Sequence, residues 1–242
     1  MKFNTLTMIL VLFCFKANAQ QQYETGQIWI GLNVSPNRSF RNLDNTENNA
    51  YNDSIYNEKS KETQKTGYSF GFAFSKMMRK KISFETGLQF SNQGYQKIYR
   101  GLVFGSMLTS SGTPTKTATM YYRYKFQYLG IPLKLSFLFG EERTRFFVCA
   151  GMNLNILLKS NIRGTIDYPS SKNEVIKFSS NTTYNKFNLA PYISLGVMSQ
   201  INSKLNFKIG PYFNYDILSI RNSSLKENLW DLGFNIGLYR LL

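Results

Sequence analysis

Six charged side chains stand at positions where the alternation of a β-strand turns them, or could turn them, toward a narrow enclosed space. They are Glu85, Lys125, Lys134, Lys208, Asp216 and Asp231. Two kinds of chemistry fit such a set. The charges could line a polar lumen for a small solute or a proton, or they could pair with one another and fill the space. A barrel of eight strands leaves room only for side chains, which favours the second interpretation.

Histidine is absent from the chain, which removes the usual general base. Ser-His-Asp hydrolysis, His-assisted acyl transfer to lipid and most zinc sites are therefore excluded. Cys149 without a histidine partner is a poor nucleophile, and we expect it to pack as a small residue. The sequence also has no phosphate-cradling glycine loop and no calcium-loop pattern. We therefore predict no catalytic, cofactor-binding or metal-binding residue, and no enzymatic activity.

The first nineteen residues have the pattern of an export signal. Lys2 is followed by a short apolar run over residues 6–15 and by Ala17-Asn18-Ala19, an A-x-A cleavage site. Cleavage after Ala19 would leave residues 20–242 as one domain. The mature chain has Cys149 as its single cysteine, so it cannot form an internal disulfide.

The mature chain is strongly basic. Without Lys2 and Lys16 it keeps 27 Lys and Arg against 14 Asp and Glu, a net charge of +13. These cations are scattered with no dense run, and the chain carries an export signal, so we do not expect nucleic-acid binding. We expect attraction to anionic lipid headgroups and to lipopolysaccharide phosphates instead.

Residues 66–78 show the element that must position the charges. Tyr68, Phe70, Phe72 and Phe74 have one parity, and Ser69, Gly71, Ala73 and Ser75 have the other. Period two places these sets on opposite faces of one strand. A face of small and polar residues does not suit open solvent, where Lys, Glu, Thr and Gln are usual. It suits the interior of a membrane β-barrel whose aromatic face meets lipid.

Eight segments show this alternation: 27–35, 66–78, 82–95, 121–139, 145–158, 186–198, 205–217 and 230–239. Their connectors alternate between short turns, near residue 80, at 140–144 and at 199–204, and longer loops at 36–66, 100–120, 159–183 and 220–228. Short turns at one rim and long loops at the other are typical of outer-membrane barrels. The sequence therefore predicts an all-β fold, an eight-stranded antiparallel up-and-down transmembrane β-barrel after a cleaved signal peptide.

The fourth segment is irregular. The parity of Tyr122, Tyr124 and Phe126 does not match that of Ile131 and the apolar residues after it. A bulge near Gly130 would restore one lipid face. Alternatively, the aromatics lie above the membrane and point inward. The sequence leaves both open.

Residues 128–137, YLGIPLKLSF, resemble the Tyr-Leu-x-Ile-Pro-Leu strand of the PorT-like outer-membrane β-barrel family of Gram-negative bacteria. FETGLQFSNQGY is similar to that family's third-strand segment, and LGFNIGLY to its closing strand. Gly130 stands where the family often has an acidic or amide residue, and Leu242 stands where many members end in an aromatic. The resemblance implies the barrel fold, and for some members a link to protein secretion across the outer membrane.

The residues and the resemblance together predict a monomeric, non-enzymatic barrel of the outer membrane. Its partners would be the lipid bilayer, lipopolysaccharide and envelope or secretion proteins, and its role would be structural or would depend on interactions through the outer loops. Two alternatives remain open at this point: a component of an outer-membrane secretion apparatus, and a soluble periplasmic barrel that carries a lipophilic ligand.

Overall fold

The computed structural model describes residues 24–45, 53, 58–103, 117–140, 143–167, 174–178, 184–221, 223 and 225–242. The predicted signal peptide, residues 1–19, lies outside these residues, and its cleavage after Ala19 stays a prediction. The strands are β1 (Ile28–Asn45), β2 (Glu62–Arg79), β3 (Ile82–Val103), β4 (Thr117–Phe139), β5 (Thr144–Asp167), β6 (Glu174–Phe178), β7 (Phe187–Asn202), β8 (Leu205–Tyr215) and β9 (Leu225–Leu241). A 3-10 helix, η1 (Glu58–Lys61), precedes β2.

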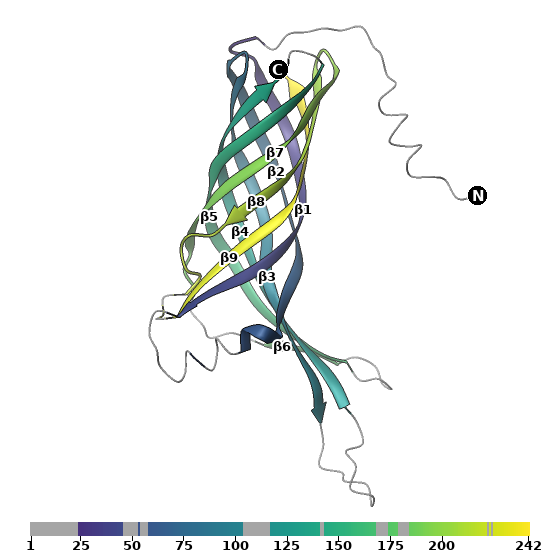
Figure 1. Ribbon diagram of the computed structural model, residues 1–242, viewed down its shortest axis with the longest axis vertical. Helices are drawn as coiled ribbons and strands as arrows, with labels where there is room; N and C mark the ends of the chain where they lie inside the picture. The colour runs from purple at the N-terminus through teal and green to yellow at the C-terminus, as the bar shows by residue number, and fades with distance from the viewer. Residues whose placement is uncertain are drawn as a thin grey trace, which may run out of the picture.

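The strands close into a barrel. Each is antiparallel to its neighbours in the order β4-β3-β2-β1-β9-β8-β7-β5, and pairing between β4 and β5 closes the ring of eight (Figure 1). The ninth strand, β6, pairs only with the far end of β5. The predicted eight-stranded antiparallel barrel is confirmed, with a short additional strand in the segment 159–183 that we had expected to be loop. No helix in the described residues has the length and apolar run needed to cross a membrane.

The strands are longer than the predicted segments. A membrane β-strand needs about 9–11 residues, whereas β3, β4 and β5 have 22, 23 and 24. Parts of the expected loops 36–66, 100–120 and 159–183 are therefore strand. The apolar alternation that we used to find strands ends where lipid ends, but antiparallel pairing continues beyond it. In Figure 1 these strand ends, together with β6, project from the end of the barrel opposite the short turns.

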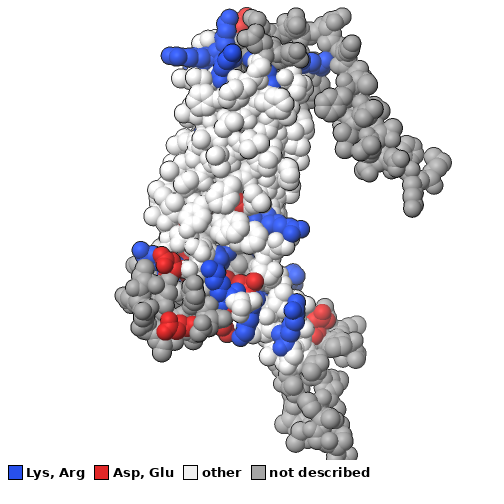
Figure 2. Space-filling view, viewed as in Figure 1, with Lys and Arg blue, Asp and Glu red and all other residues white. Residues whose placement is uncertain are grey.

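The two faces of the wall divide as the alternation predicts. On β2, Phe72 is 72% exposed while Ala73 beside it is 5% exposed. The outward residues of the other ring strands are also large and apolar, and their inward neighbours are mostly Gly, Ser and Asn. Figure 2 shows the result on one side of the barrel, a middle belt almost without charge between ends that carry Lys and Arg. An exposed apolar belt of this kind is the surface that a membrane barrel presents to lipid.

The irregular fourth strand is explained by inward aromatics. Phe126 and Tyr128 are each 1% exposed and share the inward parity of Lys134. The predicted alternative of a bulge near Gly130 in this strand is wrong, because β3 pairs with β4 without a shift from Phe126 to Gly130. The shift lies in β5, where Gln127 and Tyr128 pair with Lys159 and Leu157 and leave Leu158 as the extra residue.

Candidate functional site

The interior near the short turns holds an ion-pair cluster around Glu85. Lys208 Nζ lies 3.2 Å from Glu85 Oε2, and Lys134 Nζ lies 4.0 Å from Oε1. The Tyr239 hydroxyl donates a hydrogen bond of 2.9 Å to the same carboxylate. The Lys134 ammonium also stands 4.1 Å from the centre of the Tyr192 ring. The predicted inward positions of Glu85, Lys134 and Lys208 are confirmed, and the fold brings these three side chains together.

A second polar group fills the middle of the barrel. Asp231 accepts hydrogen bonds from Gln93 Nε2 at 2.7 Å and from Asn214 Nδ2 at 3.2 Å. Asp216 accepts one from Asn188 Nδ2 at 3.1 Å. Both carboxylates are buried, as predicted, and amide side chains are their main hydrogen-bond donors. Amide donors stabilise a buried carboxylate without placing a second charge in the interior, although Asp216 Oδ1 has no hydrogen-bond partner among the described residues.

The space left among these side chains is small. The cavity beside Glu85 and Lys208 measures about 20 Å³, and the cavity beside Asp231 measures about 10 Å³. One water molecule needs roughly 10–15 Å³ of such space. Among the described residues these two cavities therefore have room for isolated waters at most, which favours the filled-interior interpretation.

The opposite end of the interior contains an ion-pair cluster that the sequence did not reveal. Arg41 Nη1 donates to Glu227 Oε2 at 2.8 Å, and the same guanidinium pairs with Glu62. Arg221 Nε lies 3.4 Å from Glu227 Oε1, and the Arg41 guanidinium covers the Tyr95 ring at 4.1 Å. We call Arg41, Glu58, Glu62, Lys97, Arg221 and Glu227 the inner cluster.

At the rim of the inner cluster, η1 contacts β3. Burial by itself would raise the pKa of Glu58, but hydrogen bonds from Lys97 Nζ at 3.1 Å and from the Tyr99 hydroxyl at 2.9 Å lower it overall. The sequence does not reveal the inner cluster, because its pattern predicts loops at residues 36–66 and 220–228. A signal was present, since Asn37, Ser39 and Arg41 continue the inward alternation of β1.

The prediction that Lys125 could face the interior is wrong. The inward parity of β4 is that of Phe126, so Lys125 stands on the outer face of the wall. There it lines a groove of about 870 Å³ that crosses β2 to β5. The lining residues are Gln64, Lys65, Thr66, Asn92, Gln96, Arg123, Lys125, Lys159, Asn161, Ile162 and Arg163.

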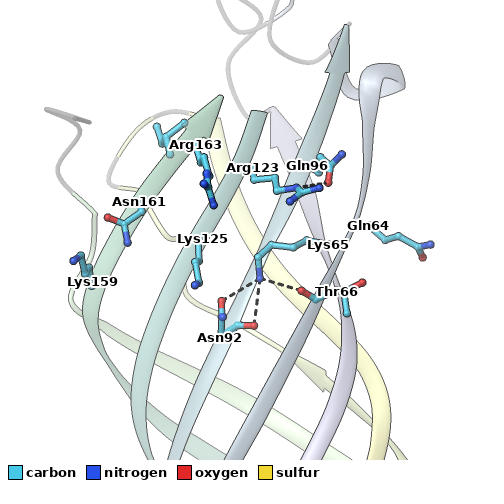
Figure 3. A pocket seen from close by; sticks show the side chains of 11 residues that line it. Gln64, Lys65, Thr66, Asn92, Gln96, Arg123, Lys125, Lys159, Asn161 and Arg163 are labelled. Atoms are coloured by element: carbon cyan, nitrogen blue, oxygen red, sulfur yellow. Dashed lines mark hydrogen bonds between the residues drawn. The ribbon is translucent and has the colours of Figure 1, made fainter. Parts of the chain in front are cut away.

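This groove, which we call the basic groove, carries five cations and no acid among its lining residues (Figure 3). Strand register explains the assembly, because Arg123 of β4 pairs directly with Arg163 of β5, and Lys125 pairs with Asn161. Gly94 faces Lys125 from β3, where a Cβ would clash with the backbone oxygen of Tyr124 and would stand 3.3 Å from Lys65 Cδ.

Lys65 is the most enclosed cation of the basic groove, at 8% exposure. Its ammonium donates to the Asn92 side-chain oxygen at 3.1 Å and to the backbone oxygens of Asn92 and Thr66 at 3.5 and 3.3 Å. These acceptors satisfy its hydrogen bonds but carry no net charge. Burial, with Lys125 and Arg123 adding repulsion, lowers the pKa of Lys65 to about 8.

Cys149 lies in β5 and is 1% exposed, so the prediction that it packs as a small residue is confirmed. It belongs to an apolar cluster with Phe147 and Tyr192. Within the part of the chain that the structure describes, no group of three or more Cys, Asp or Glu side chains is placed to hold a metal ion.

A family model described as "Outer membrane protein beta-barrel domain" matches residues 18–223. The chain belongs to this family. The family description points to the outer membrane, and the closed ring and apolar belt are the features that a membrane barrel requires. No curated protein matches the chain.

Several solved structures are similar to this family member. Neisserial surface protein A (NspA) is 10% identical, with 87% of this chain and 95% of that chain covered and a TM-score of 0.42. OprG of Pseudomonas aeruginosa is 12% identical, with 92% and 96% covered and a TM-score of 0.43. Ail of Yersinia pestis, solved with a heparin analogue, is 11% identical, with 88% and 99% covered and a TM-score of 0.29.

Proposed function

We propose that this protein is a non-enzymatic, PorT-like outer-membrane barrel whose specific role is an interaction made by the strand ends and loops beyond the membrane. The carrying observation is the contrast between a filled interior and a long external extension. Lipid-facing positions on β4 end at Leu129, yet the strand continues over residues 117–128. At about 3.3 Å per residue, that is roughly 40 Å of strand beyond the hydrocarbon core.

The extension has a packed structure of its own. Ala118, Met120 and Ile166 form a buried cluster, with the rings of Tyr99 and Tyr122 set edge to face at 5.7 Å. Spanning the membrane requires none of these residues, so another use must account for a paired sheet with its own core. In outer-membrane barrels the long-loop side faces the cell exterior, which gives this extension access to partners there.

The interior does not support the alternative of a soluble carrier of a lipophilic ligand. A carrier needs a cavity of several hundred cubic ångströms lined mainly by apolar groups. Here the cavities beside Glu85 and Asp231 measure about 20 and 10 Å³. The apolar surface lies on the outside instead, where Phe72 and Phe146 are 72% and 67% exposed.

A site-specific photo-crosslinking experiment tests the proposal. One photoreactive residue replaces Arg100, an exposed position in the extension, and a matched one replaces Lys204, exposed at a short turn. We expect discrete protein or polysaccharide adducts from position 100 on intact cells, and none from position 204. Adducts from position 204 alone would contradict the proposal and would favour a secretion component that acts from the periplasmic side.

A further inference from the structure

The basic groove lies at the edge of the lipid-facing belt that is next to the extension. On β5 the outward residues Ile156 and Leu158 are 53% and 57% exposed, and Lys159 follows directly. On β4, Lys125 is four residues beyond Leu129, which is about 13 Å along the strand and roughly 10 Å along the membrane normal for a tilted strand. Lys159, next to the belt, therefore lies at the level of the polar headgroup layer, and Lys125 lies at the outer side of that layer.

The cations of the groove repel one another. Arg123 and Arg163 are directly opposite in register, and like charges in that position destabilise a sheet. Arg123 donates to the uncharged Gln96 side chain at 3.2 Å. Among the described residues, none of the five cations has a carboxylate partner. A sheet that holds five cations around one hollow without an internal acid is suited to an anion from outside.

We propose that the basic groove binds the phosphate groups of a phosphorylated glycolipid of the outer leaflet, the lipid A part of lipopolysaccharide. Guanidinium and ammonium groups are the usual partners of phosphate, through charge-assisted hydrogen bonds. The groove lies on the outer face of the wall and therefore opens toward the membrane. The acyl chains of the same molecule can lie along the exposed apolar residues of the neighbouring lipid-facing belt. A soluble phosphate would gain the charge contacts but not this apolar surface.

The geometry also assigns roles within the groove. Lys65 is fixed by three acceptors at the wall and supplies charge rather than free donors. Lys125, Lys159 and Arg163 have no other partner among the described residues and are the groups that would donate to phosphate oxygens. The inference rests on the proposed placement of this end of the barrel at the outer leaflet.

The test measures lipid binding by the folded full-length mature protein in nanodiscs of neutral phospholipid. The probes are bisphosphorylated lipid A and the same lipid A after enzymatic removal of its phosphates. One variant carries Lys125→Gln, Lys159→Gln and Arg163→Gln. A matched variant carries Lys76→Gln, Arg79→Gln and Lys204→Gln, which remove the same charge from exposed positions at the short-turn end.

We expect the groove variant to bind the phosphorylated probe about tenfold or more weakly, because several hydrogen bonds to a charged group are lost. The matched variant should change by less than about twofold, since exposed and distant charges are screened. The dephosphorylated probe should bind weakly to every form. Equal losses in both variants, or no preference for phosphate, would overturn the proposal. Displacement of the lipid by low millimolar pyrophosphate would replace it with a site for soluble anions.

Folding is checked separately by the heat-modifiable mobility of the barrel in gels. If the triple variant does not fold, single Lys159→Gln and Arg163→Gln variants take its place, with Lys76→Gln and Lys204→Gln as their controls. The outcome is independent of the crosslinking at position 100. Lipid A binding without adducts would support the binding site in the groove and reject the interaction role of the extension. Adducts without groove-dependent binding would support the interaction role and reject the binding site.

Discussion

The inner cluster and the basic groove lie near the same end of the barrel and on opposite faces of the same wall. Inside, Arg41 contacts two glutamates, Glu62 and Glu227, and Lys97 contacts Glu58. Outside, Lys65, Arg123, Lys125, Lys159 and Arg163 gather without an acid among the lining residues. The difference follows from what each face meets. A closed interior supplies no counterion, so buried charges must be paired or hydrogen-bonded within the chain. The outer face meets a headgroup layer that can supply phosphate.

Breaking the inner cluster should have the largest effect on stability. Glu227 is 1% exposed, and its carboxylate pairs with both Arg41 and Arg221. Glu227→Gln removes that shared negative charge. We expect a loss of about 3–5 kcal/mol, the usual cost of removing one partner of a buried ion pair. Urea unfolding in lipid vesicles, followed by tryptophan fluorescence, measures it. A Glu227→Gln variant that unfolded at the same urea concentration as the Arg163→Gln variant of the groove would contradict the comparison.

A charge placed at the middle of the lipid face should have the next largest effect on the free energy of unfolding. Phe72→Arg is expected to cost about 2–4 kcal/mol, the midplane penalty for a lipid-facing cation. Phe72→Leu keeps an apolar side chain and serves as the control in the same unfolding assay. If the arginine variant inserted and unfolded like the leucine variant, the outward assignment of Phe72 would be wrong.

Removing a cation from the basic groove should have a smaller effect on stability, and the effect should be a gain instead of a loss. Arg163→Gln relieves the repulsion with Arg123 across the β4–β5 pair. In neutral lipid we expect a gain of about 0.2–1 kcal/mol. In vesicles that contain bisphosphorylated lipid A, the gain should disappear or become a loss, because the wild-type groove then holds its anion. A gain of the same size in both lipids would argue against phosphate in the groove.

The last expected effect is confined to the titration of one side chain, Lys65. Burial, together with repulsion from Lys125 and Arg123, lowers the pKa of Lys65 to about 8, and the acceptors that face its ammonium, Asn92 and Thr66, are uncharged. A bound phosphate favours the charged ammonium and should raise that pKa toward the ordinary value of about 10.4. NMR of ¹³C-methylated lysines, with Lys65→Arg to assign the signal, reports both values. An unchanged pKa on addition of lipid A would count against the groove.

Much of the barrel could be predicted from the sequence because lipid imposes a strict alternation. Phe70, Phe72 and Phe74 can face lipid only if Ser69 and Ala73 face inward, and the structure places them so. The same parity placed Glu85, Lys134, Lys208, Asp216 and Asp231 inside. At these positions the outward face of the strand meets lipid and is apolar. A shift of one residue would turn the polar residues toward lipid and the apolar residues inward.

The extension and the basic groove could not be predicted in this way. Beyond Leu129 both faces of β4 carry polar or aromatic residues, so alternation no longer tells inside from outside. Lys125 was placed wrongly for this reason. The extra residue Leu158 in β5 then reverses the parity of Lys159 and Arg163, and only the strand register reveals that they join Lys125 on one face.

The central claim is that the interior is filled by paired and hydrogen-bonded side chains, so that function lies on the outer surfaces. Recording from purified protein in planar bilayers tests this most directly. The account predicts no steady conductance, because Glu85, Lys134 and Lys208 close one level of the interior and Asp231 and its amide partners close another. Reproducible porin-like steps from a folded monomer would contradict it.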